Sequence, residues 1–276
     1  LSEILIFCLV ISFFILATLG STPDGSNLTK IDWAHAVNNK AYLASALATM
    51  LEADIVLGHI LGSEDGPIIP IMAHPPANTS DLSLFEFLST IKEFNKISDK
   101  RKGIKLDFKS IEAFEAAQEL ISGISNEDSF PLWLNADILP GPVNSTSTPV
   151  DARRFLTLSG NHSSVVLSIG WTTRWAEEGE YTLAQIQEMI DVLKELSVKQ
   201  SVTFPVRASL AANSNEVLLK LLSNTSHLES TLTVWDSTDD PVDVGKLRDV
   251  ILNVGLDRTY LDVKPDLQEE LNLPDN

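Results

Sequence analysis

The chain has 276 residues, of which 44% are hydrophobic and 21% charged, and its formal net charge is −18 at pH 7. This length and composition exclude a disordered chain and allow one or two domains, and single α/β barrels commonly reach this size. The negative charge repels phosphate backbones, so we expect no nucleic-acid partner.

The first element is apolar. Residues 4–19 form a run of apolar or small side chains that is short for a membrane span and typical of the central region of a signal peptide. We therefore expect a signal peptide over residues 1–20 and a linker over 21–29, with an uncleaved signal anchor as the alternative. The one cysteine, Cys8, lies inside this run, so no disulfide framework is expected in the domain.

Short β-branched or apolar runs follow, and each alternates with a helical pattern. The expected strands cover residues 31–36, 50–56, 103–109, 131–138, 165–171, 202–209, 231–237 and 258–265, and 67–73 is expected to pair locally after the second strand. The expected helices cover residues 83–97, 111–121, 150–158, 183–198, 214–222 and 242–254. The segment 40–49 also favours a helix, and Thr182 is a plausible cap for the helix that begins at residue 183.

Eight such units predict a single (β/α)8 barrel of the TIM type over residues 30–270, followed by a tail over 271–276. An open, doubly wound sheet is the alternative. The chain lacks a G-x-G-x-x-G motif after its first strand, which disfavours the dinucleotide-binding form of that alternative.

Asn-x-Ser/Thr triplets, which are potential sites of N-glycosylation, occur along the chain. A single triplet arises easily by chance, but several after a signal-like segment fit a glycosylated extracellular domain. The candidate acceptors are Asn27, Asn78, Asn144, Asn161 and Asn224.

Polar residues gather where the expected strands end, which is where (β/α)8 barrels carry their chemistry. Glu52 and Asp54 are two residues apart and so point to one face of a strand, as do Asp107 and Lys109. Converging carboxylates need a cation or a lysine to neutralise them, and oxygen ligands suit Mg²⁺ or Ca²⁺ better than zinc. A single aspartate at a strand end is more often a cap or a surface charge. The cation site is therefore indicated by the acidic residues together and not by any one of them.

Other strand ends add further candidates. They carry His35, Lys105, Asn135, Asp137, Arg207, Ser209, Trp235, Asp236, Asp262 and Lys264, and His74 lies in the loop after the second strand. Histidines are mostly structural when they stand alone, and we give that interpretation to His59, His162 and His227.

Several segments resemble the menorin family. They read DWAHAVNNK, MLEADI, PIMAHPP, GIKLDFKS, PLWLNADILPGPV and LTVWDS, and the resemblance spans about residues 30–265. Menorin-like domains are in turn similar to the phospholipase C-like phosphodiesterase barrels, which include glycerophosphodiester phosphodiesterases and spider-venom phospholipases D.

The venom enzymes carry a His-x-Val-Asn motif, which His35 to Asn38 match, and a Glu-x-Asp metal pair, which Glu52 and Asp54 match. The resemblance implies that Glu52, Asp54 and Asp107 hold a divalent cation, either Mg²⁺ or Ca²⁺. It implies that His35 and His74 share the roles of nucleophile and acid. It also implies phosphate contacts from Lys109 and substrate contacts from Asn38, Trp235 and Arg207.

The flanking residues differ from those of the glycerophosphodiesterases, which have Arg-Gly where this chain has Ala36 and Val37, and Asp where it has Pro75. Menorin proteins are known as secreted parts of adhesion complexes that pattern dendrites. The resemblance therefore favours a secreted, extracellular binding module with cell-surface protein partners. The alternative is a metal-dependent phosphodiesterase with a phospholipid or another phosphodiester as its ligand. A membrane-anchored location is the alternative to secretion.

Overall fold

The computed structural model describes residues 26–63, 65–125, 131–176 and 178–275. The expected signal peptide, with Cys8, lies outside the described residues. Within the described ranges, no helix combines the length and apolar character that a membrane crossing requires.

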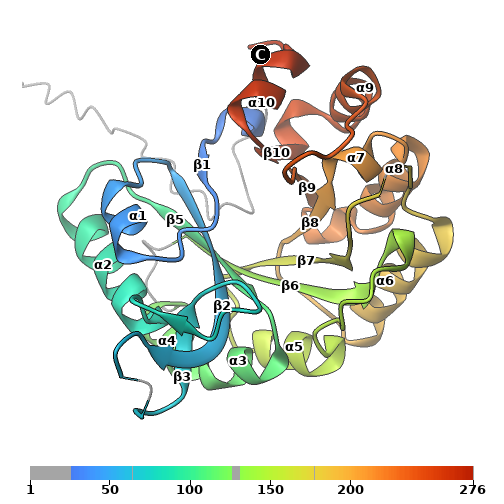
Figure 1. Ribbon diagram of the computed structural model, residues 1–276. Helices are drawn as coiled ribbons and strands as arrows, with labels where there is room; N and C mark the ends of the chain where they lie inside the picture. The colour runs from blue at the N-terminus through green and yellow to red at the C-terminus, as the bar shows by residue number, and fades with distance from the viewer. Residues whose placement is uncertain (1–25, 64, 126–130, 177, 276) are drawn as a thin grey trace, which may run out of the picture.

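Eight parallel strands form a nearly closed barrel (Figure 1). Their order around the sheet is β1 (Trp33–Ala34), β2 (Met50–Ile60), β5 (Gly103–Phe108), β6 (Leu132–Pro140), β7 (Val166–Thr172), β8 (Val202–Arg207), β9 (Thr231–Trp235) and β10 (Thr259–Asp262). The first and last strands meet, since the Trp33 ring lies edge-on to Tyr260 at 6.3 Å. The single (β/α)8 barrel is therefore confirmed and the open-sheet alternative is wrong.

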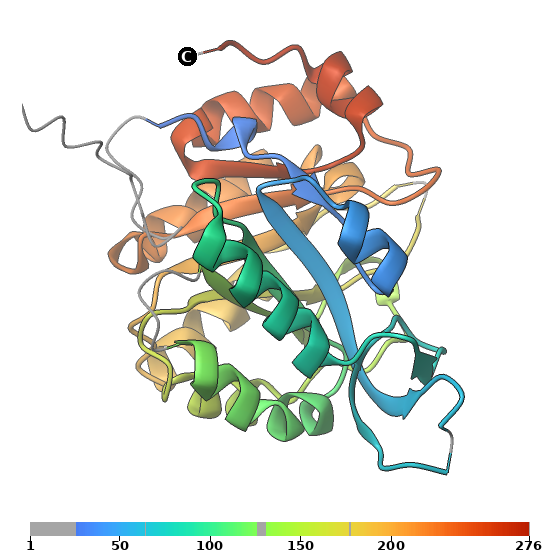
Figure 2. The ribbon, with the colours of Figure 1, turned by 90° about the vertical axis from the view of Figure 1, so that its left-hand side faces the viewer.

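Helices surround the strands on the outside. They are α1 (Lys40–Ser45), α2 (Leu84–Ile97), α3 (Ile111–Ala116), α4 (Gln118–Ser125), α5 (Ala152–Ser159), α6 (Leu183–Glu195), α7 (Ala208–Ala211), α8 (Asn215–Asn224), α9 (Val244–Val254) and α10 (Pro265–Leu271). Short 3-10 turns lie at η1 (Leu28–Lys30), η2 (Pro142–Asn144), η3 (Ser226–Leu228) and η4 (Leu256–Arg258). Figure 2 shows β2 between α1 and α2. The predicted cap at Thr182 is present as a capping box with Gln185.

The second strand is longer than predicted and leaves the barrel. From Ile55 it pairs antiparallel with β3 (Ile69–Met72), so the predicted local pairing is confirmed, and its last two residues pair in parallel with β4 (Thr79–Ser80). Figure 2 shows this extension projecting beyond the barrel. Gly58 permits it, because a Cβ atom there would lie 2.2 Å from the Asn78 carbonyl oxygen.

Other boundaries also differ from the prediction. The first strand stops before Ala36, whose φ of 55° is not extended. The sixth barrel strand ends at Arg207, so Ser209 lies in α7. The last strand ends at Asp262, because Pro265 begins α10. The helix predicted over 111–121 divides into α3 and α4 at Ala117.

The outward faces of the barrel strands are apolar, and they pack on the helices in one large core cluster. The inward faces are polar, because side chains alternate along each strand. The middle of the barrel holds Glu52, Lys105, Asn135, Ser168, Thr203 and Thr233. Most barrels of this type fill that space with branched apolar side chains.

Aromatic rings seal the barrel at the amino-terminal ends of its strands. Trp133 lies 5.4 Å from Trp33 and 4.9 Å from Tyr260, each pair in an edge-to-face arrangement that favours aromatic rings. In the part of the chain that the structure describes, these rings close this end, so the polar interior faces the carboxyl ends of the strands, which we call the mouth.

Candidate functional site

Three carboxylates converge at the mouth. Glu52 and Asp54 lie on β2, and Asp107 lies opposite Asp54 on β5. Each provides one oxygen atom, and these atoms all lie within 4.8 Å of one another. Glu52 and Asp54 are buried, and Asp107 is half-buried. The spacing of two residues on adjacent strands thus places the acids together, as their sequence positions predicted.

The segment after β1 holds two of these acids in place. The backbone N–H of Ala36 donates to Glu52 Oε2 at 2.8 Å. Asn38 donates from Nδ2 to Asp54 Oδ2 at 2.7 Å, and its Oδ1 accepts from the Asp54 N–H at 2.9 Å. Asn38, which the family resemblance suggested as a substrate contact, is therefore bound to Asp54 and orients its carboxylate.

His35 lies beside the cluster and links the first strand to the last. Its Nδ1 is 3.1 Å from Asp262 Oδ2 and 3.5 Å from Glu52 Oε2. Its side chain is 54% exposed, so the other ring nitrogen, Nε2, remains available at the mouth. The Glu52 carboxylate raises the pKa of His35 to about 9, burial opposes the rise, and Asp262 adds to it. His35 is therefore protonated at neutral pH.

Lys109 bridges two of the acids. Its Nζ lies 2.8 Å from Asp54 Oδ1 and 2.5 Å from Asp107 Oδ2. Burial works against the charged ammonium, yet Asp107 and Asp54 together hold the pKa of Lys109 well above its ordinary value. Burial likewise opposes ionisation of Asp107, but Lys109 outweighs it and lowers the pKa of that carboxyl group.

Negative charge remains in excess at the mouth. Five carboxylates face three cationic groups there: Glu52, Asp54, Asp107, Asp137 and Asp262 against Lys105, Lys109 and His35. Burial raises the pKa of Glu52 to about 7, and His35 opposes that rise. Burial also raises the pKa of Asp137 to about 7, and Asp107 adds to it. Part of this charge is therefore relieved by protonation.

The residues fit a divalent cation. Carboxylate oxygens are the preferred ligands of Mg²⁺ and Ca²⁺, and oxygens around Ca²⁺ at about 2.3–2.6 Å lie up to roughly 5 Å apart. The three oxygens, all within 4.8 Å of one another, satisfy that spacing. The unmatched negative charge at the mouth favours a bound cation for the same reason.

His74 follows β3 at the rim of the mouth. Its neighbour Ala73 donates its N–H to the Asp54 carbonyl oxygen at 3.0 Å, which places the residue next to the acid-bearing strand. The His74 side chain is exposed, and its Nδ1 contacts the Pro75 carbonyl oxygen at 2.7 Å. The pairing of His74 with His35 across the mouth stays a prediction.

Arg207 and Trp235 lie together on the far side of the mouth. The Arg207 guanidinium stacks over the Trp235 ring at 5.3 Å and donates from Nε to Asp240 Oδ2 at 2.7 Å. Both partners of this ion pair are buried. The ion pair therefore fixes the β9–α9 loop on the barrel, and Trp235 is the part of this group that is half-exposed.

Sequence reasoning left three residues of the mouth without a role. Asp262 holds His35, Lys105 lies 3.8 Å from Asp262, and Asp240 binds Arg207. Asp262 could have been found from the sequence, because Asp262 and Lys264 have the same spacing as Asp107 and Lys109. Asp240 lies in a loop, and no strand periodicity marks it.

The remaining histidines lie away from the carboxylates. His162 is buried between α5 and β7, where its ring contacts Ser125 Oγ at 3.0 Å and Gln118 Oε1 at 3.2 Å. His59 lies on the projecting part of β2, and His227 is exposed in η3. These placements agree with a structural interpretation.

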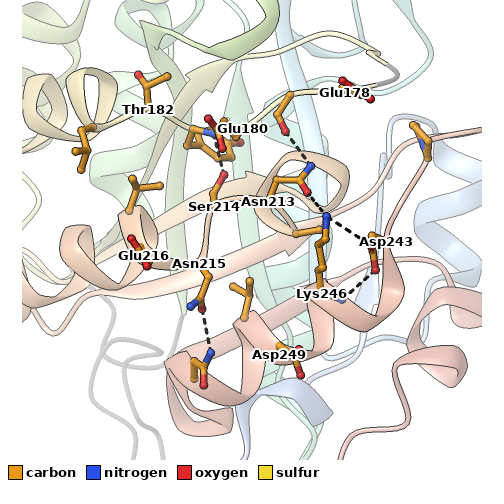
Figure 3. Close-up of a pocket in the computed structure, with 18 residues that line it drawn as sticks. Glu178, Glu180, Thr182, Asn213, Ser214, Asn215, Glu216, Asp243, Lys246 and Asp249 are labelled. Atoms are coloured by element: carbon orange, nitrogen blue, oxygen red, sulfur yellow. Dashed lines mark hydrogen bonds and ion pairs between the residues drawn. The ribbon is translucent and has the colours of Figure 1, made fainter.

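A separate hollow of about 1250 Å³ lies among α6, α8 and α9 (Figure 3). Lys246 on α9 contacts Asn213 at 3.1 Å and Asp243, which caps the same helix, at 3.6 Å. Glu178, Glu180, Glu216 and Asp249 complete its acidic lining. The hollow contains none of the carboxylates of the mouth.

Comparison with known proteins identifies relatives of the whole barrel. The family described as the Menorin N-terminal domain matches residues 27–268. Protein FAM151B from Homo sapiens is 39% identical over 246 residues, which cover 86% of this chain and 83% of that protein.

Proposed function

The chain belongs to the menorin family, and we propose that its barrel mouth binds a divalent cation together with a phosphodiester and cleaves the diester. The observation that carries this proposal is the convergence of Glu52, Asp54 and Asp107 beside His35. Phosphodiester cleavage requires neutralisation of the phosphate charge, a nucleophile and an acid. Each requirement has a candidate group at the mouth.

His35 is the proton donor in this proposal. Asp262 and Glu52 occupy its Nδ1 side, so Nε2 carries the proton that passes to the leaving oxygen. The hydrogen bond between Nδ1 and Asp262 favours the protonated ring. A protonated resting state suits an acid better than a nucleophile.

His74 is then the proposed nucleophile. Its ring nitrogen attacks phosphorus while the bond from phosphorus to the leaving oxygen breaks and His35 protonates that oxygen. Water, which gives a proton back to His35, then cleaves the phosphorus–nitrogen bond, releases the phosphate monoester and restores His74. The cation held by Glu52, Asp54 and Asp107 would neutralise the phosphate oxygens. Lys109 and Trp235 border the space in which the substrate would lie.

Turnover tests this proposal. Purified protein is assayed against lysophospholipids and glycerophosphodiesters with and without Mg²⁺. We expect Mg²⁺-dependent product that His35→Ala abolishes, while His227→Ala, which removes an exposed histidine, retains it. Absence of product from the wild type, with folding intact by circular dichroism, would reject the enzymatic role.

A second candidate function is an extracellular binding module in an adhesion complex with cell-surface proteins. The exposure of four acceptor asparagines, Asn78, Asn144, Asn161 and Asn224, supports export with glycan attachment. Asn144 follows β6 at the mouth, whereas Asn161 and Asn224 precede strands at the opposite end. Asn27 differs, because its Nδ2 donates to the Pro274 carbonyl oxygen at 3.3 Å.

Expression in a secretory host tests this second candidate. We expect protein in the medium whose mass falls on deglycosylation. The four-fold variant with Gln at the exposed acceptor positions should lose most of that mass difference. Protein that stays in the cytosol with an unchanged mass would contradict export.

A further inference from the structure

Lys109 contacts two of the three carboxylates that a cation would need. Its Nζ contacts Asp54 Oδ1 and Asp107 Oδ2, which belong to two of the three carboxylates of the cluster. An ammonium ion and a divalent cation that share the same two carboxylates repel each other strongly at such short range. Both therefore cannot keep these contacts at once.

We propose that Lys109 is an exchangeable counter-ion, which neutralises Asp54 and Asp107 until a divalent cation displaces it and which then binds the substrate phosphate. This inference rests on the proposed function of the mouth. It adds that cation binding and phosphate binding are coupled through one side chain, because the cation releases the ammonium that the phosphate uses.

The surroundings of Lys109 permit such an exchange. Its backbone is fixed, since its N–H donates to the Ile55 carbonyl oxygen at 3.1 Å, but its side chain is 23% exposed at the mouth. Lys105 provides the contrast. Its side chain is 5% exposed, with Nζ above the Trp33 ring and 3.8 Å from Asp262. Lys105 is enclosed by the barrel, whereas Lys109 borders solvent.

The exchange predicts that loss of Lys109 strengthens cation binding. Removal of a metal-site lysine that only assists the phosphate would leave cation affinity nearly unchanged. Removal of a competing ammonium should tighten cation binding, by at least about tenfold for a contact at this distance. The same change should weaken phosphate binding, because the released ammonium is absent.

Calorimetry of the full chain with Ca²⁺ and Mg²⁺ tests the inference without any assay of activity. We expect Lys109→Gln to bind the cation at least about tenfold more tightly than the wild type, and Lys109→Arg, which keeps the charge, to bind near wild-type strength. Lys264→Gln is the matched control, because it removes a lysine that contacts Asp236 outside the cluster. A cation that binds Lys109→Gln alone would also support the exchange.

Other outcomes overturn it. Equal or weaker cation binding by Lys109→Gln, with a wild type that binds, rejects the exchange and leaves the proposed function standing. Absence of binding by both rejects the cation site itself and the exchange with it. A crystal structure of the wild type with Ca²⁺ needs no variant. A bound ion with Nζ still on both Asp54 and Asp107 would contradict the inference.

Discussion

The contact between His35 and Asp262 joins residues that are 227 positions apart in the chain. It exists only because the barrel brings β1 and β10 together. Burial opposes ionisation of Asp262, but the hydrogen bond and charge of His35 lower the pKa of this carboxyl group, so it stays a carboxylate. A fixed carboxylate on Nδ1 selects the ring orientation, a positioning role that enzymes use widely.

Asp262→Asn tests that positioning. Loss of the carboxylate charge should lower the pKa of His35 below about 9, because the imidazolium loses a partner. If the mouth is catalytic, turnover should fall by about 10²–10⁴. The pKa is measured by NMR titration of the ring, which does not depend on activity. Asp266→Asn, an exposed change in α10, is the control, and an unchanged pKa in Asp262→Asn would refute the role.

The sequence predicted one part of the mouth better than the other. Glu52, Asp54 and Asp107 follow from alternation within strands, a local property that sequence displays directly. The hydrogen-bond and ion-pair partners of the polar side chains do not follow from this alternation. That Asn38 binds Asp54, and that Asp240 binds Arg207, depends on loop paths that no periodicity encodes.

At the scale of elements, helices with strong signals were the most predictable. The helix after Thr182 begins where its capping box predicted, because the cap is a local hydrogen-bond pattern. The length of β2 was not predicted, because its residues after Val56 pair with β3 and β4. This pairing depends on close contact at Gly58. Strand ends are thus set by partners as well as by composition.

His162 connects α4 to the segment before β7, and burial lowers its pKa below 6.5. The unfolded chain therefore binds a proton more readily than the folded one. The stability that this neutral histidine contributes is fully present above about pH 6.5 and is lost as the pH falls toward its lower folded pKa. We expect this group to lower the free energy of unfolding from pH 7 to pH 5. Glu52 and Asp137 act in the opposite direction there, because their raised pKa values of about 7 make the folded chain the stronger proton binder.

Urea unfolding at several pH values measures this dependence. His162→Gln should make the change in the free energy of unfolding from pH 7 to pH 5 more favourable than in the wild type, even if its absolute stability is lower through lost hydrogen bonds to Ser125 and Gln118. His227→Gln, an exposed change, provides the control. An identical slope in His162→Gln and the wild type would assign the pH dependence to other groups.

At the scale of the whole molecule, closure of the barrel follows from the count of alternating strands and helices, and its polar interior does not. Ser168 donates to Asn135 at 2.6 Å, and Thr203 and Thr233 share a hydrogen bond of 2.7 Å across neighbouring strands. Such pairs satisfy buried polar groups within the barrel. Their sum is a charged, hydrogen-bonded interior that opens at one end and is sealed by aromatic rings at the other.

A ligand that binds this mouth in the folded chain alone should stabilise the whole barrel. We expect millimolar Mg²⁺ or Ca²⁺ to raise the melting temperature. At a hundredfold excess over Kd the gain is about 2.7 kcal/mol, or on the order of 5–10 °C for a domain of this size.

Asp54→Asn should remove this shift, because the amide lacks the charge that the cation requires, although it can still face Asn38. Asp249→Asn removes an exposed carboxylate on α9 and should keep the full shift. Differential scanning calorimetry at fixed ionic strength separates specific binding from charge screening, since Na⁺ at equal ionic strength provides the baseline. An equal shift in Asp54→Asn and the wild type would place the stabilising ion outside the mouth, because Asp54 is one of the three proposed ligands.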